Sequence, residues 1–227
     1  MIFVTGDLHA DYDWSKLNTK NFPEQKSLSR NDYVIVCGDF GAVWDNSKSD
    51  KYVQEWHENK IYTTLFVEGN HENFDLLAQY KVEEWHGGKV QFITPHIIHL
   101  MRGQVYEING YTFFTMGGAQ SYDMWHRKEH ISWWKEELPS NEEYEEAFIN
   151  LERVNNKVDY IITHCAPDDV QDLLSGHLYE HNKLTNFLEV VRQTVEFKEW
   201  YFGHYHIDKD YGRYHCLYRQ APLKIGD

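Results

Sequence analysis

The sequence lacks three features that are typical of membrane, secreted and disulfide-rich proteins. No apolar run approaches the ~20 residues that a membrane-spanning helix needs, so we expect no membrane partner. The first residues, 1–5, are followed directly by Gly6-Asp7 and lack the basic start of a secretory signal. The three cysteines, Cys37, Cys165 and Cys216, form no CxxC pair, which argues against a disulfide framework. Together these absences favour a cytoplasmic protein in a reducing compartment.

Positive charge is also scarce. The chain has 22 Lys and Arg against 36 Asp and Glu, a formal net charge of -14, and its basic residues are scattered rather than gathered in a stripe. Such a chain repels long polyanions, so long DNA or RNA is disfavoured as a partner, and so is a nuclease acting on polymers. The acidic balance suits a protein that gathers divalent cations, although solubility alone accounts for most of it.

The apolar runs predict an α/β fold. Hydrophobic residues make up 41% of the chain, enough for the core of a single domain over residues 1–227. Short β-branched runs are followed by helix-like stretches, which indicates parallel strands with crossover helices. An Asn109-Gly110 pair between two further apolar runs predicts a β-hairpin. The expected strands are 2–5, 33–37, 63–67, 158–163 and 200–202, with helices at 49–59, 73–80, 141–155 and 185–195 and one or two closing strands after 210.

Polar clusters follow the expected strands, where open α/β sheets bind their ligands. One such cluster alone would be a polar turn with an Asn as helix cap, or a histidine that is merely hydrogen-bonded. Five clusters at successive strand ends are not expected by chance. They are Gly6-Asp7-Leu8-His9, Gly38-Asp39, Gly69-Asn70-His71-Glu72, Thr163-His164 and Gly203-His204-Tyr205-His206.

These residue types suit a pair of metal ions. Two divalent ions held about 3.5–4 Å apart form a clamp for phosphoryl transfer, and holding them so close requires a bridging carboxylate. Mixed oxygen and imidazole ligands suit manganese, which we favour, or iron, zinc, cobalt or nickel. A His-x-His pair on a strand places both rings on one face, so His204 and His206 can reach the same pocket. Asp7 and His9 have the same spacing.

The ordered set GDLH, GD, GNHE, TH and GHYH resembles the calcineurin-like metallophosphoesterase superfamily, whose pattern is GDxH, GD, GNH(E/D), H and GHxH. The segments 117–122 and 132–134 look like those of small bacterial and phage members. The resemblance implies a sandwich of two mixed β-sheets flanked by helices. It also implies a first metal held by Asp7, His9 and His206, a second held by Asn70, His164 and His204, and Asp39 bridging the two. His71 would contact the phosphate, as would Asn70, and would act as general acid.

The second motif departs from the phosphoprotein phosphatases, which carry GDxxDRG where this chain reads GDFGAVWD. The phosphate-gripping Arg and the Asp that orients the histidine are therefore missing. We expect Asp45 to orient His71, Arg102 or Arg127 to hold phosphate, and Trp125 to stack on an aromatic group of the substrate. Arg127 and Trp125 belong to residues 117–139, part of a possible lid or insertion at about 117–155. The alternative is a surface excursion whose Trp residues cover a core edge.

The expected reaction is hydrolysis of a phosphomonoester or phosphodiester by direct attack of a metal-bound hydroxide. A stacking lid and an acidic exterior favour a small, nucleotide-like phosphoester as substrate. Two alternatives stay open: a serine/threonine phosphoprotein phosphatase-like activity, and a non-catalytic binding or scaffold member of the fold. The complete set of candidate ligands argues against the non-catalytic alternative.

Overall fold

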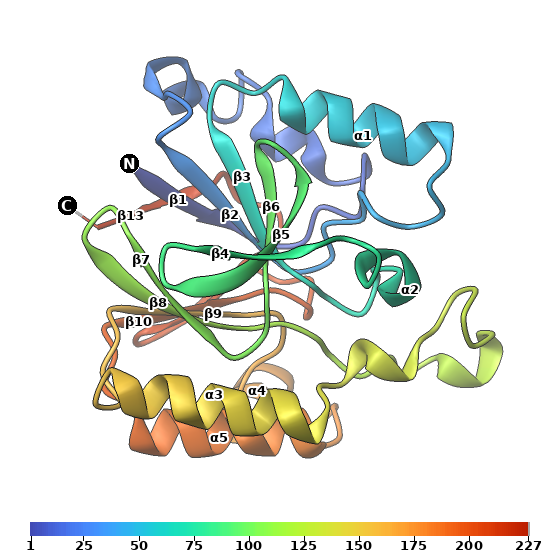
Figure 1. Cartoon of the computed structure of the whole chain (residues 1–227). Helices are drawn as coiled ribbons and strands as arrows, with labels where there is room; N and C mark the ends of the chain where they lie inside the picture. Colours follow the sequence, from blue (N-terminus) through green and yellow to red (C-terminus); the bar gives the residue numbers. More distant parts are fainter. Residues whose placement is uncertain (227) are drawn as a thin grey trace.

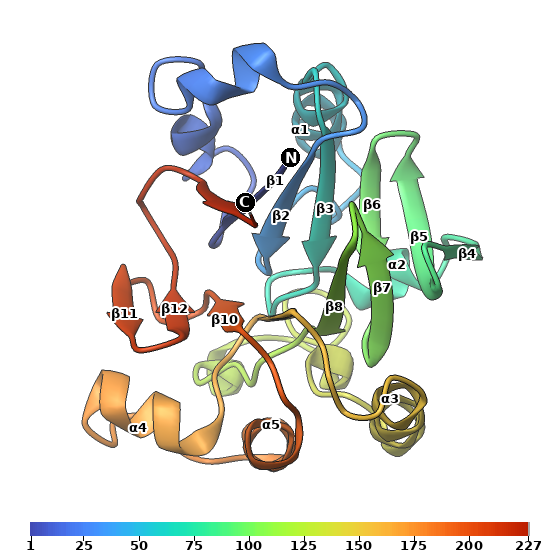
Figure 2. The ribbon, with the colours of Figure 1, turned by 90° about the vertical axis from the view of Figure 1, so that its left-hand side faces the viewer.

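The computed structural model describes residues 1–226, which form two mixed β-sheets packed face to face with helices on both outer faces (Figures 1 and 2). This confirms the predicted fold class. No helix in this range is long and apolar enough to cross a membrane.

The first sheet has seven strands in the order β13-β1-β2-β3-β6-β5-β4. Its centre is parallel, as the alternation of strands and helices predicts. Toward the edges, β13 pairs antiparallel with β1, β5 with β6, and β4 with β5. The strands are β1 (Ile2–Thr5), β2 (Tyr33–Cys37), β3 (Thr63–Val67), β4 (Val82–Trp85), β5 (Gly88–Thr94), β6 (Ile97–Leu100) and β13 (Leu223–Ile225).

The second sheet has six strands in the order β11-β12-β10-β9-β8-β7. The predicted hairpin joins β7 to β8, and Asn109 and Gly110 have φ of 51° and 82°, the left-handed values that a two-residue hairpin turn requires. The strands are β7 (Gln104–Ile108), β8 (Tyr111–Met116), β9 (Tyr160–Thr163), β10 (Glu199–Phe202), β11 (Lys209–Tyr211) and β12 (Tyr214–Cys216).

Helices cover the outer face of each sheet. The first sheet carries α1 (Lys48–Glu58), the single turn α2 (Phe74–Leu77) and the 3-10 turns η1 (Trp14–Leu17) and η2 (Pro23–Ser27). The second carries α3 (Asn141–Arg153), α4 (Asp168–Ser175) and α5 (Lys183–Thr194). The sequence pattern did not predict α4, a helix of only two turns that follows Pro167.

The core has three layers, because both faces of each sheet are buried. Leu65 of the first sheet and Ile162 of the second belong to the cluster between the sheets. Tyr144, Ala147 and Leu151 of α3 pack on the outer face of the second sheet. The possible lid at 117–155 therefore differs from the structure from residue 141 onward, since α3 is a core helix.

The parallel strands of both sheets direct their carboxyl ends to one edge of the sandwich. Here β1, β2 and β3 end next to one another, and so do β9 and β10. The five polar clusters follow these strands. Residues 117–139, with the short turns η3 (Met124–His126) and η4 (Lys135–Glu137), leave β8 and project beyond the body of the molecule near α2 (Figure 1).

Candidate metal centre

Asp39 lies between two imidazoles from opposite sheets. Its Oδ2 is 3.2 Å from Nε2 of His9, and its Oδ1 is 3.4 Å from Nε2 of His164. The side chain is buried. A carboxylate that presents one oxygen to each of two histidines has the arrangement required of a bridging ligand.

One side of Asp39 can hold a metal ion. The side chains of Asp7, His9, Asp39 and His206 each offer a ligand atom, and these four atoms lie within 4.8 Å of one another. The rings of His9 and His206 are 4.9 Å apart, and Nε2 of His206 is 3.3 Å from Oδ2 of Asp7. Two carboxylates and two imidazoles suit a divalent transition metal.

The other side gathers His164, Asn70 and His204. The Nδ1–H of His164 donates to the carbonyl oxygen of Cys37 at 2.8 Å, which directs Nε2 inward. That nitrogen is 3.2 Å from Oδ1 of Asn70 and 3.4 Å from Oδ1 of Asp39. The His204 ring lies 5.0 Å from the His164 ring. Three lone-pair atoms that converge in this way repel one another unless a cation or a proton lies between them, so the residues fit a metal ion.

The electrostatics of the centre agree with this geometry. Burial disfavours the charged imidazole, yet the Asp39 carboxylate raises the pKa of His9 to about 9 and that of His164 to about 10. Burial opposes ionisation of Asp39, but His164 holds the pKa of that carboxyl well below its usual range. Burial and His164 lower the pKa of His204 to about 3. Surroundings that favour the protonated form of these two imidazoles also attract a divalent cation.

The backbone at the expected ligands is strained. His9, Asp39, His204 and His206 have φ of 45°, 45°, 67° and 52°, in the left-handed region that non-glycine residues seldom adopt. The prediction that strand alternation places His204 and His206 on one face is wrong, because β10 ends at Phe202 and both residues lie beyond it. Left-handed turns, not strand alternation, bring His204 beside His164 and His206 beside His9.

Two motif glycines allow the clusters to approach one another. A Cβ on Gly69 would lie 2.0 Å from Oδ1 of Asp39, and a Cβ on Gly203 would lie 1.9 Å from Oδ1 of Asp7. Any side chain at either position would displace a candidate ligand.

Two supporting residues were not predicted. Glu72 is buried, and its carboxylate accepts from the backbone N–H groups of Phe40, Gly41 and Gly69 at 2.7, 3.1 and 2.6 Å, so it ties the loops after β2 and β3 together. Lys16 is buried too, and its Nζ donates to the carbonyl of Asp7 at 2.6 Å. Glu72 belongs to the third polar cluster, so the sequence marks it as a candidate functional residue. The sequence does not indicate that it connects the two loops. Lys16 gives no sequence signal, because a lone lysine in a polar stretch is normally exposed.

His71 lies at the rim of the centre. Its backbone N–H donates to Oδ1 of Asp39 at 2.9 Å, and its ring is 5.8 Å from that of His9. Two guanidinium nitrogens of Arg127 lie 3.5 Å from its two ring nitrogens, so the structure brings these two predicted residues together. Burial and the charge of Arg127 lower the pKa of His71, although Asp39 acts in the opposite direction.

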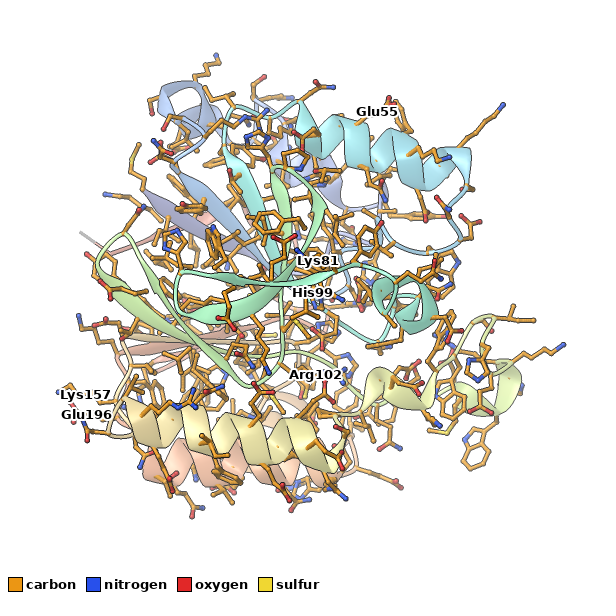
Figure 3. All side chains as sticks on the ribbon, viewed as in Figure 1. Glu55, Lys81, His99, Arg102, Lys157 and Glu196 are labelled. Carbon is orange, nitrogen blue, oxygen red and sulfur yellow. The ribbon has the colours of Figure 1, made fainter. Side chains whose placement is uncertain are left out.

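The structure corrects the roles predicted for Arg102 and Asp45. Arg102, labelled in Figure 3, is buried. Its guanidinium pairs with Glu68 and donates to the carbonyl of Glu136 at 2.8 Å, so it is not free to hold phosphate. Asp45 is exposed, and its Oδ1 accepts from the N–H of Ser47 at 2.9 Å. Within residues 1–226, no hydrogen bond or ion pair joins Asp45 to His71.

The segment 117–139 contributes a different aromatic residue from the one predicted. Trp125 is 84% exposed, and no ring contact involves it in the described part of the chain. Tyr122 instead lies beside the centre, with its ring 6.1 Å from that of His204 and 5.0 Å from that of Tyr179. Trp134 is buried, and its ring lies 5.5 Å from that of Trp44.

A cavity of about 400 Å³ opens beside His9 and His71. Tyr12, Trp44 and Asp45 are among its other lining residues. It is large enough for a small organic group bound next to the rim histidine.

The profile of the calcineurin-like phosphoesterase family matches residues 1–208. No curated protein matches the chain. Among solved structures, the sulfate thiohydrolase SoxB from Thermus thermophilus in complex with glycerol is 12% identical with a TM-score of 0.46, over 97% of this chain and 51% of that one. The chain thus spans about half the length of that protein.

Proposed function

Because the chain belongs to the calcineurin-like phosphoesterase family, we propose that it hydrolyses a phosphomonoester or phosphodiester with the help of two divalent metal ions. The observation that carries this proposal is the position of Asp39 between His9 and His164, 3.2 Å from one imidazole and 3.4 Å from the other. A scaffold protein without turnover would have no need of such a strained and electrostatically costly arrangement.

Asp39 would be shared by two ligand sets, Asp7 with His9 and His206 on one side and Asn70 with His164 and His204 on the other. Bound there, divalent ions would supply an activated water and neutralise the charge of the phosphate. Manganese is the ion we favour for this ligand set.

The rim residues would act on the substrate. The guanidinium of Arg127 would donate to phosphate oxygens, while the ring of His71 would give its proton to the leaving oxygen. A bound phosphate would place negative charge beside both side chains, and this would favour the protonated imidazole that a general acid requires.

A small, nucleotide-like phosphoester is the substrate we propose. Tyr122 and Arg127 come from the same segment, so one excursion of the chain offers both an aromatic ring and a phosphate-binding cation near the centre. The cavity beside His71 suits a small group, and the net charge of -14 disfavours long polyanions. The departure of the second motif from GDxxDRG speaks against a phosphoprotein phosphatase.

The test is a substrate panel with enzyme that has been stripped of metal and reloaded with one ion at a time. The panel contains p-nitrophenyl phosphate, its bis ester, cyclic nucleotides and a phosphopeptide. We expect hydrolysis that needs added metal, is highest with manganese and is faster on nucleotides than on the phosphopeptide. Metal-independent turnover, or no turnover on any ester with two bound ions, would contradict the proposal.

A further inference from the structure

Asn70 makes two different contacts through the two ends of its side-chain amide. Oδ1 faces Nε2 of His164 at 3.2 Å, inside the metal centre. Nδ2 donates to Oγ of Ser121 at 3.0 Å, away from it. An amide has only one oxygen, so a rotation of 180° about its last bond would turn the NH₂ group, which cannot bind a cation, toward the metal.

Ser121 is well placed to oppose that rotation. It is 2% exposed and comes from the start of the 117–139 segment, 51 residues after Asn70 in the chain. Its hydroxyl oxygen accepts from Nδ2 only while Oδ1 points inward. In the rotated amide an oxygen would face it instead, and the hydroxyl would have to turn and donate its own hydrogen to keep the contact.

The position of Ser121 is itself fixed. Its backbone N–H donates to Oε2 of Glu137 at 3.1 Å, and Glu137 is also 2% exposed. Three residues earlier, the N–H of Gly118 donates to the carbonyl of Glu68 at 2.7 Å. Glu68 directly follows β3 and precedes the Gly69-Asn70 pair, so the base of the segment is tied to the same loop that carries Asn70.

We propose that Ser121 is a positioning residue that orients the amide of Asn70 toward the second metal ion. The inference rests on the proposed function, because it assumes that an ion binds between Asn70, His164 and His204. It assigns the base of the 117–139 segment to the frame of the metal centre, whatever the outer part of the segment does. Ser121 would act through Asn70 and would not touch substrate.

The experiment compares Ser121→Ala with Thr115→Val in the full chain. Thr115 is a buried control whose hydroxyl donates to the Met101 carbonyl at 2.8 Å, outside the centre. Manganese binding is followed by the electron paramagnetic resonance signal of free Mn²⁺, which yields both dissociation constants. Loss of a residue that orients a metal ligand typically weakens metal binding by about 10–100-fold. We expect this loss for the second ion only, with the first unchanged, and no loss for either ion in Thr115→Val.

A double-mutant cycle with Asn70→Asp separates orientation from simple packing. A carboxylate has two equivalent oxygens, so its rotation does not matter and Ser121 has no orientation to enforce. The effect of Ser121→Ala on the second ion should therefore largely vanish in the Asn70→Asp background. An equal loss in both backgrounds would overturn the proposal, as would wild-type affinity in Ser121→Ala. If Ser121→Ala does not fold, Ser121→Cys takes its place, and an unchanged second constant there overturns the proposal too.

These outcomes are distinct from failure of the proposed function. If the wild-type chain binds two manganese ions but hydrolyses no ester, the function fails and the role of Ser121 can still be measured. If it binds one ion only, the two-metal centre is wrong and the inference falls with it.

Discussion

Arg127 lies across the imidazole of His71, with two guanidinium nitrogens each 3.5 Å from a different ring nitrogen. Asp123 forms an ion pair with the same guanidinium, with 2.8 Å between Nε of Arg127 and Oδ1 of the carboxylate. Burial and the nearby guanidinium lower the pKa of His71. A phosphate anion bound beside the two groups would act in the opposite direction.

Replacement of Arg127 by Ala should lower kcat/KM by about 10–100-fold, the value of a charge-assisted hydrogen bond of ~1.5–3 kcal/mol. If the segment binds a nucleotide, the loss should be larger on nucleotides than on p-nitrophenyl phosphate. Trp125→Ala in the same segment is the matched control, and its exposure predicts a change of no more than about twofold. Equal effects of the two substitutions on both substrates would show that Arg127 does not bind the substrate.

Replacement of Asp39 by Asn should remove most bound metal and nearly all turnover. One neutral amide cannot hold two dications close together, because their repulsion is no longer offset by a bridging charge. Elemental analysis of the purified variant measures this directly. Asp169→Asn, which changes an exposed carboxylate on α4, should retain wild-type metal content. Two ions per chain in an active Asp39→Asn variant would show that Asp39 does not bridge.

Replacement of His71 by Ala should reduce the rate without emptying the metal centre. General acid catalysis is typically worth ~10²–10⁴-fold, and the loss should shrink for esters whose leaving groups are good enough to depart without a proton. The dependence of kcat on the pKa of a series of phenol leaving groups measures this. Loss of metal as complete as in Asp39→Asn would identify His71 as a ligand instead.

A fourth prediction concerns stability and lies outside the metal centre. Burial, with a smaller effect of Lys60, lowers the pKa of His57 to about 3 from its ordinary value of 6.5. Between these two pH values the unfolded chain binds a proton at His57 and the folded chain does not. The free energy of unfolding therefore carries no penalty from His57 above pH 6.5, and it falls as the pH decreases below that value. At pH 5 this one group should cost about 2 kcal/mol.

His57→Phe removes the titrating group and keeps a ring of similar shape beside Phe40 and Trp56. Urea unfolding of metal-free protein at pH 5 and pH 7 should show a smaller pH dependence in this variant than in the wild type. An identical pH dependence in the two proteins would mean that His57 is protonated in the folded state as well.

The sequence alone predicted the places where chemistry could occur. Buried strands at 2–5, 33–37 and 63–67 are visible as apolar β-branched runs, and the structure has them with the same bounds. The ordered clusters after these strands also implied the family, which the profile match confirms. Both inferences depend on local patterns, because parallel strands end at a common edge whatever their loops contain.

The partners of individual side chains were not predictable in the same way. Arg102 was a plausible phosphate ligand until packing placed it against buried Glu68, and Asp45 is close in sequence to the second motif but faces solvent. Tyr122 replaces Trp125 as the aromatic residue beside the centre for a similar reason. Arginines, carboxylates and aromatic residues elsewhere in the chain could each have filled the same role by their chemistry. Only the course of the chain in three dimensions decides which of them lies beside the centre.

The sequence thus predicted the composition of the candidate metal centre, since carboxylate, amide and imidazole groups at strand ends are suitable ligands for divalent metal ions. The tertiary structure decided how these groups are oriented. Left-handed turns direct His204 and His206 to opposite sides of Asp39, and Ser121 contacts the amide of Asn70 from a segment 51 residues away. Such orientations arise from contacts between residues that are distant in the chain, and the free energy of those contacts has no signature in local sequence.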